Sequence, residues 1–292
     1  MSQTSDTQLP VGLLYMAGSA LALSIMSLMV KLAGERLPTF ELVMARSIIM
    51  LVIAAGHLRW IDQNPWGNNR PLLLARGLVG FSALSCFFYA VTHLPLADAT
   101  LLHYLNPVFA AIIAALFLRE PIEPAEALGI VASLAGVALI QQPGFLFGGS
   151  GRLALFPVLI ALAGALLAAT AYVLVRHLRT SEHPIVIIFY FSLVAAPASM
   201  VIGLPGALWP TTAEWLLLAG IGITAYASQV MMTRGLHLEK AGRATAVTYL
   251  QIAFAFGWDM LIFGQFPTPL SLAGALLIVG SALTIAWLRA RR

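Results

Sequence analysis

The chain has 292 residues, of which 60% are hydrophobic and only 10% are charged, and its mean hydropathy is +0.90. A soluble domain usually carries about 25% charged residues, so this composition excludes a soluble globular protein and indicates an integral membrane protein. The longest polar stretch, residues 59–70, is too short for a folded soluble domain, which needs at least about 50 residues. Any function must therefore lie within the membrane.

The basic residues lie mainly between apolar runs, so the net charge of +4 does not indicate a nucleic-acid partner. The single cysteine, Cys86, excludes an internal disulfide bond and a cysteine-rich metal site. We expect no cofactor and no metal. Residues 1–10 lack the basic region and cleavage site of a signal peptide, so the first apolar run is expected to remain as a helix.

Apolar runs of about 20 residues follow one another along the chain, and each is long enough to cross about 30 Å of hydrocarbon as a helix. The runs are continuous and do not alternate with polar residues, which favours helices over strands. The sequence therefore predicts an all-α integral membrane protein with ten transmembrane helices. The ten predicted spans are residues 10–32, 39–58, 71–92, 97–118, 125–142, 153–177, 184–204, 213–234, 243–263 and 269–288.

The positive-inside rule gives an orientation for these spans. If the N-terminus is cytoplasmic, the outer connections hold Lys31, Arg36 and Arg152, and Arg46 and Arg76 fall within spans or at their edges. The other basic residues would all lie inside, namely Arg59, Arg70, Arg119, Arg176, Arg179, Arg234, Lys240, Arg243, Arg289, Arg291 and Arg292. This asymmetry predicts that both termini are cytoplasmic, and the short connections and lack of targeting signals predict a bacterial inner membrane.

The second half of the chain repeats the first at an offset of about 145 residues. Polar residues match in register, which shared hydropathy does not explain; examples are Tyr104 with Tyr249 and Asn106 with Gln251. The predicted units are residues 1–145 and 146–292. Each has five spans, an odd number, so the second copy enters the membrane from the opposite side. Inverted five-helix repeats are typical of secondary transporters, in which alternating access exposes a site between the halves.

Polar residues on several spans share helix faces by their i, i+3, i+4 spacing. Lipid does not solvate such groups, so these faces are expected to meet one another or a water-filled space. The substrate-binding candidates are His103, Tyr104, Tyr249, Tyr89, Tyr226, Gln229, Ser82 and Thr248.

Each of these groups also has a purely structural interpretation. Serine and threonine hydroxyls commonly bond the preceding helical carbonyl, and a tyrosine hydroxyl can bond a neighbouring helix. His103 can be a neutral donor between helices, or it can carry a proton near neutral pH. Pro107 predicts a kink in its span that frees carbonyls near His103 and Asn106.

Charged residues inside the spans suggest gating or structural roles. Glu41 and Arg46 are not spaced for an i, i+4 bridge, so Arg46 is expected to find its partner on another helix or in water, with an interhelical ion pair favoured. Asp259, near the outer end of its span, is a candidate partner for Lys31 or Arg36 when the outer side closes.

The segments "LNPVFAAIIAALFLREPI" at 105–122 and "FGQFPTPLSLAGALLIVGSALTI" at 263–285 resemble the drug/metabolite transporter superfamily, EamA type. The resemblance covers nearly the whole chain and implies an exporter of small metabolites with a central cavity between its halves. Within that superfamily the chain is similar to aromatic amino acid exporters of the YddG type. Gln265 departs from the pattern, because it stands where the first half has Glu120.

These features together predict a secondary exporter of neutral, in particular aromatic, amino acids or related metabolites. The expected partners are a small-molecule substrate and the lipid bilayer, with a monomeric protein. Proton exchange through His103 and downhill efflux both fit the sequence. An enzyme is disfavoured because the histidines are scattered, a channel because no charge ring lines a pore, and a nucleotide-sugar carrier because only Arg46 and Arg76 are available for phosphates.

Overall fold

The structure is a computed structural model that describes residues 11–94, 101–142, 146, 148, 155–264 and 268–290. Apart from connections, these residues form helices, and they contain no strand, so the predicted all-α class is confirmed. The first half contains α1 (Val11–Ala33), α2 (Thr39–Trp60), α3 (Arg70–His93), α5 (Asn106–Phe117) and α6 (Pro124–Gln141). The second half contains α8 (Leu155–Leu178), α9 (Pro184–Gly203), the short 3-10 helix η1 (Leu204–Gly206), α10 (Thr212–Leu238), α11 (Ala241–Val247), α12 (Leu250–Phe263) and α13 (Pro269–Ala290).

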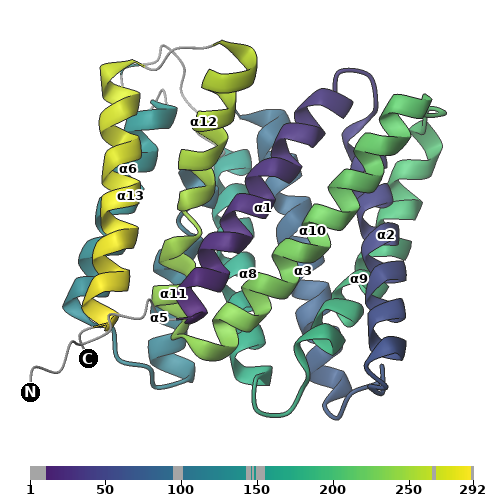
Figure 1. Cartoon of the computed structure of the whole chain (residues 1–292), viewed down its shortest axis with the longest axis horizontal. Helices are drawn as coiled ribbons and strands as arrows, with labels where there is room; N and C mark the ends of the chain where they lie inside the picture. Colours follow the sequence, from purple (N-terminus) through teal and green to yellow (C-terminus); the bar gives the residue numbers. More distant parts are fainter. Residues whose placement is uncertain are drawn as a thin grey trace, which may run out of the picture.

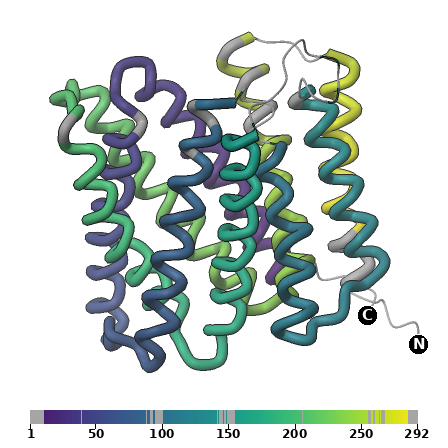
Figure 2. The backbone as a smooth tube through the Cα atoms, turned by 180° about the vertical axis from the view of Figure 1, so that it is seen from behind, coloured from purple at the N-terminus to yellow at the C-terminus, as the bar shows by residue number. Residues whose placement is uncertain are grey.

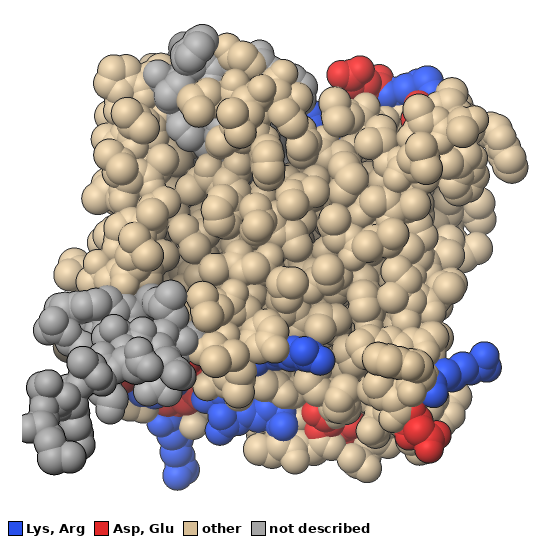
Figure 3. Space-filling model, in the orientation of Figure 1, with Lys and Arg blue, Asp and Glu red and all other residues tan. Residues whose placement is uncertain are grey.

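The helices have the length and surface of membrane-spanning elements. Six of them, α1, α2, α3, α8, α9 and α10, contain segments long and apolar enough to cross a bilayer by themselves. On the face seen in Figure 3, charged side chains gather at the two ends of the helices and leave an uncharged band between them. An uncharged band between two charged ends suits hydrocarbon flanked by headgroups, so the chain is a multi-pass membrane protein.

Local sequence explains where several of these helices begin. The Asn69 side chain accepts a hydrogen bond from the backbone N–H of Leu72 at the start of α3. At the start of α10, Thr211 and Glu214 form a capping box, in which each side chain accepts the other residue's backbone N–H. Such caps satisfy N–H groups that have no partner inside the helix. Polar caps of this kind therefore mark the ends of apolar runs.

The two halves pack into one another, and the contacts between helices occur in symmetric pairs. The 145-residue offset relates α1 to α8, α3 to α10, and α2 to α9. Accordingly α1 packs on α10 while α8 packs on α3, and α2 packs on α10 while α9 packs on α3. Helices related by the offset also meet directly, since α2 packs on α9 at one edge of the molecule and α6 on α13 at the opposite edge (Figures 1 and 2). The halves are thus interlocked repeats. The predicted boundary after residue 145 falls next to residues outside the described part and stays a prediction.

Small residues allow α6 and α13 to approach closely. A Cβ atom added at Gly274 would lie 2.5 Å from the carbonyl oxygen of Gly136, and one added at Gly136 would lie 2.6 Å from that of Gly274. The hydroxyls of Ser133 and Ser281 hydrogen-bond across the same pair of helices. Close packing of small residues with a polar contact is a common way to hold helices together in lipid.

This contact predicts that Gly274→Ala lowers the melting temperature of the purified protein in detergent. Overpacking costs about 1–3 kcal/mol, which corresponds to a decrease of about 2–10 °C. Gly280→Ala, on the same helix, is the matched control, because no described atom lies within 4 Å of its added Cβ. Equal melting temperatures for the two variants would contradict close packing at Gly274.

Candidate functional site

The helix before α5 is interrupted at Tyr104 and Leu105, one turn from Pro107. Proline has no N–H to give to the carbonyl of His103, four residues earlier. That carbonyl instead accepts a hydrogen bond of 2.9 Å from the Asn106 side-chain amide. The helix therefore breaks where the sequence predicts a kink, and Asn106 satisfies the freed carbonyl.

The equivalent position of the second half is also interrupted, at Thr248 and Tyr249 between α11 and α12. No proline lies here. The N–H groups of Thr248 and Tyr249 bond carbonyls three residues back, at 3.1 and 3.4 Å, and the Thr248 hydroxyl bonds the Thr245 carbonyl at 2.6 Å. Tight turns and a competing hydroxyl thus interrupt this helix without a proline.

The two interruptions are joined to each other. The Tyr249 hydroxyl donates a hydrogen bond of 2.7 Å to the backbone carbonyl of Tyr104, and the two rings lie 5.7 Å apart at a tilt of 32°. Tyr249 is completely buried, whereas Tyr104 is partly exposed. The matched tyrosines of the repeat therefore meet between the two halves, where α5 packs on α11.

His103 lies beside this tyrosine pair. Its ring is 4.4 Å from the ring of Phe87 and 6.0 Å from that of Tyr104. The buried Nδ1 atom has no hydrogen-bond partner among the residues that the structure describes. The imidazole therefore keeps a free polar atom within an aromatic environment.

The other candidates are distributed differently. The Tyr226 hydroxyl bonds His57 Nδ1 at 2.6 Å between α10 and α2, and Gln229, one turn along α10, has a buried amide oxygen without a partner in the described part of the chain. Tyr89 stacks on His93 at 4.0 Å near the end of α3.

Ser82 does not join this group. It is exposed and shares a helix face with Leu74 and Leu78, which are also exposed. Helix α3 packs on α8 and α9. No contact of Ser82 with the other candidates is found among the described residues, so its role in substrate binding stays a prediction.

The charged candidates also differ from expectation. Glu41 is 3% exposed and accepts a hydrogen bond of 2.8 Å from the backbone N–H of Leu208. The ion pair favoured for Arg46 is not found with any described residue. Arg36 pairs with Glu214, whose hydrogen bond raises the pKa of the Arg36 guanidinium. The side chain of Asp259 lies outside the described residues, so its gating role stays a prediction.

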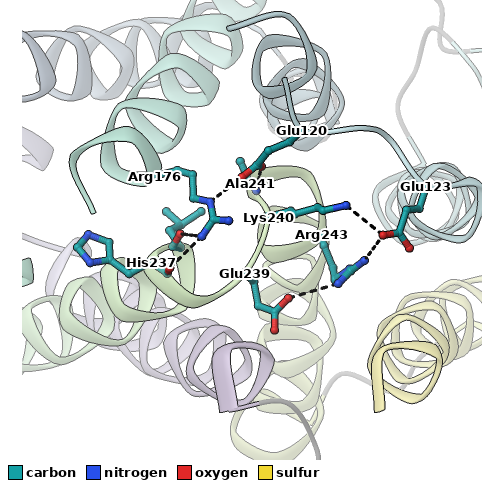
Figure 4. Close-up of polar contacts among 9 residues, drawn as sticks. Glu120, Glu123, Arg176, His237, Glu239, Lys240, Ala241 and Arg243 are labelled. Carbon is teal, nitrogen blue, oxygen red and sulfur yellow. Dashed lines mark hydrogen bonds and ion pairs between the residues drawn. The ribbon is translucent and has the colours of Figure 1, made fainter. Parts of the chain in front are cut away.

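A network of ion pairs closes the end of the molecule where α1 begins and α13 ends (Figures 1 and 4). At its centre Arg176, at the end of α8, bonds Glu120 at 2.8 Å, and their side chains are 7% and 15% exposed. Arg176 also donates to the carbonyls of Leu236 and His237 at 3.1 and 2.8 Å. The other oxygen of Glu120 accepts from Ala241 N–H at 3.0 Å.

The network continues from Glu123, in the same connection between α5 and α6. Its carboxylate pairs with Lys240 at 3.1 Å and with Arg243 at 2.9 Å, and Arg243 also reaches Glu239 at 3.4 Å. Acidic residues of the first half thus hold basic residues of the second. The sequence marks Glu120 only as a repeat position and Arg176 only as a basic residue of an inner connection, because periodicity does not reveal a contact between residues 56 apart.

Within the described ranges, no group of three or more histidine, cysteine, aspartate or glutamate residues could hold a metal ion.

The chain is similar to known transporters along nearly its whole length. The model of the EamA-like transporter family matches the chain twice, over residues 10–142 and 155–287. The pseudopaline exporter CntI of Pseudomonas aeruginosa is 32% identical over 275 residues, covering 94% of this chain and 95% of the exporter. Solute carrier family 35 member G1 of Homo sapiens is 30% identical over 291 residues, covering 93% and 77%. A protein of known crystal structure has the same fold, with a TM-score of 0.83 at 22% identity over 98% of this chain and 99% of that one.

The bond between the two interruptions predicts that Tyr249→Phe lowers both stability and transport. Loss of the hydroxyl removes about 0.5–1.5 kcal/mol and leaves the Tyr104 carbonyl unsatisfied. Tyr190→Phe is the matched control, because its hydroxyl donates a similar bond of 3.0 Å to the Trp66 carbonyl near one end of the molecule. Melting temperatures should fall in both variants and transport rate only in Tyr249→Phe. Equal transport in both would contradict a role for the central pair.

Proposed function

Because the chain belongs to the EamA-like transporter family, we propose that it is a secondary transporter that exports small metabolites by alternating access. The observation that carries this proposal is the pair of helix interruptions joined by Tyr104 and Tyr249. Inverted-repeat transporters place their substrate sites at such interruptions, near the bilayer midplane. The family and the names of the relatives indicate a transporter rather than an enzyme.

The proposed topology has ten crossings. Residues before Tyr104 and helix α5 together make the fourth crossing, and α11 with α12 makes the ninth. Five crossings per half, in units of residues 1–145 and 146–292, give the halves opposite orientation. The excess of basic residues at one end of the helices supports cytoplasmic termini in a bacterial inner membrane. The proposed transporting unit is a monomer.

The proposed cargo is an amino acid or related metabolite, with aromatic amino acids as the first to test. The tyrosine pair and His103 offer flat faces on which an aromatic ring can stack, and stacking costs little entropy because these rings have few rotatable bonds. Around them, Thr248, Gln229, Tyr226 and Tyr89 would supply hydrogen bonds. Other metabolites are also candidates for the cargo, since one similar protein is named a pseudopaline exporter.

In this account the ion-pair network of Figure 4 is the inner gate, and it is closed. Opening the inner side would separate Glu120 from Arg176 and Glu123 from Arg243. The equivalent outer positions in the repeat are Gln265 and Lys31. A glutamine carries no charge, so the two gates would differ in strength.

A transport assay tests the proposed function. Proteoliposomes with the protein should take up labelled phenylalanine or tryptophan faster than empty liposomes, and Tyr104→Ala and His103→Ala should slow this uptake at least about tenfold, which corresponds to 1.4 kcal/mol. Equal flux in empty and protein-containing liposomes would contradict the proposal. A transmembrane pH gradient separates the two coupling modes, because it changes the rate only if protons are exchanged.

Cysteine accessibility tests the inner gate. Thr245, completely buried in α11 behind the network, is replaced by cysteine in a Cys86→Ser background. Adding Glu120→Gln should raise the rate of labelling from the inner side about tenfold. A loss of 1.4 kcal/mol in the free energy that favours the closed state raises the population of the open state by that factor. Glu214→Gln at the outer pair is the control and should not raise it. Equal labelling with and without Glu120→Gln would show that the network is not a gate.

A further inference from the structure

Among the residues that the structure describes, two arginines within the spanning helices, Arg46 and Arg76, have no carboxylate partner. Arg76 is 3% exposed, and its Nε and Nη1 atoms have no hydrogen-bond partner in the described part of the chain. The buried Nε atom of Arg46 likewise has none among those residues. Arg46 lies seven residues from the start of α2, about 10 Å of helix, and Arg76 lies six residues from the start of α3, about 9 Å. These two helix starts are at opposite ends of the molecule (Figure 1), so the arginines approach its middle from both sides.

Both side chains belong to inward-facing surfaces. Arg46 begins a stripe on α2 that continues at i+4 spacing through Met50, Ala54 and Leu58, each no more than 1% exposed. The Arg76 guanidinium lies 4.5 Å from the centre of the Phe191 ring on α9. Gly80 leaves room for it, since a Cβ there would lie 2.9 Å from Nη1.

Helix α8 relates these arginines to the central tyrosines. It packs on α3, which carries Arg76, and on α5, which follows the interruption at Tyr104. Its Tyr172 lies near both Arg76 and Tyr104, and the positive charges of Arg46 and Arg76 are close enough to repel each other. The arginines therefore lie on helices that adjoin those with the interruptions.

The same chain satisfies its other buried arginines. Arg176 and Arg243, 6% and 7% exposed, each have carboxylate partners at 2.8 and 2.9 Å. An unpaired charge in a membrane interior is costly, and two of like sign repel each other as well. Packing alone does not explain why both positions carry an arginine, because an uncharged side chain could also pack on the Phe191 ring. A negative group that arrives with the cargo would neutralise them.

We propose that Arg46 and Arg76 form an anion site that binds the carboxylate of the transported molecule, and that the cargo is an organic acid with net negative charge. The inference rests on the proposed transport function and specifies its substrate class. Guanidinium groups match carboxylates with two parallel hydrogen bonds. The ring of Phe191, beside Arg76, suits an apolar or aromatic body. The ammonium group of a neutral amino acid would be repelled by the same two charges, so a carboxylate without an amine binds more tightly.

Ligand-induced thermal shifts of the protein in nanodiscs test the anion site directly. The probes share an aromatic ring and differ in charge: phenylsuccinate, 3-phenylpropionate, phenylalanine and phenethylamine, with inorganic phosphate as an ion without an organic body. Affinity should fall in that order, with no shift from phenethylamine and none from phosphate. Equal shifts from phenethylamine and 3-phenylpropionate would overturn the proposal, and so would a phosphate shift equal to that of phenylsuccinate.

Substitutions separate ligand binding from a structural role. Arg46→Met and Arg76→Met should each weaken phenylsuccinate binding at least tenfold and leave the melting temperature of the ligand-free protein unchanged or higher, because an unpaired charge is removed. Arg176→Met should lower the melting temperature, since it breaks a satisfied pair. Arg234→Met, at an exposed arginine beside the Tyr15 ring, should change neither quantity. Retained binding together with a lower melting temperature in Arg46→Met and Arg76→Met would overturn the anion site.

The two proposals fail in different ways. Transport of phenylalanine that survives Arg46→Met and Arg76→Met would overturn the anion site and leave the transporter intact. Arginine-dependent binding of phenylsuccinate without flux of any probe in proteoliposomes would support the anion site and contradict transport.

Discussion

In hydrocarbon, every backbone N–H and C=O group must find its partner within the protein, and the two helix interruptions are where this constraint is most demanding. The carbonyl freed by Pro107 bonds Asn106, and the neighbouring carbonyl of Tyr104 accepts the Tyr249 hydroxyl from the other half. The first break therefore depends partly on the second half, whose Tyr249 supplies a partner for the Tyr104 carbonyl. The proposed site lies between the repeats, where a change in their relative position would alter it.

The need for a partner applies to charged side chains as well as to the backbone. At the inner end, Arg176 has a carboxylate and two carbonyl partners, and the surrounding ion pairs hold loops of both halves together. In the interior, Arg46 and Arg76 lack such partners within the described residues. Satisfied cations are suited to closing a gate, whereas unsatisfied ones are suited to binding a ligand. This contrast links the proposed inner gate and the proposed anion site in a single account of transport.

Sequence alone predicts much of the fold, because hydropathy and the 3.6-residue period determine where helices lie. It also predicts the break near Pro107, where the missing N–H is visible in the sequence. The break at Thr248 has no such signal, since tight turns and hydroxyl bonding produce it. Helical spacing places Ser82 on a polar face of α3, but spacing does not show which helices cover that face. The partner of Glu120, and the lack of one for Arg46 among the described residues, depend on contacts between distant segments, which periodicity does not encode.

The central claim is that two interlocked halves expose one site to each side in turn, and distances between spin labels measure this most directly. In a Cys86→Ser background, one label pair at Arg119 and Arg179 reports the inner end, and a second pair at His93 and Met260 reports the outer ends of α3 and α12. Alternating access predicts that added cargo shifts the two distance distributions in opposite directions. Distances that stay constant, or that lengthen together, would contradict it.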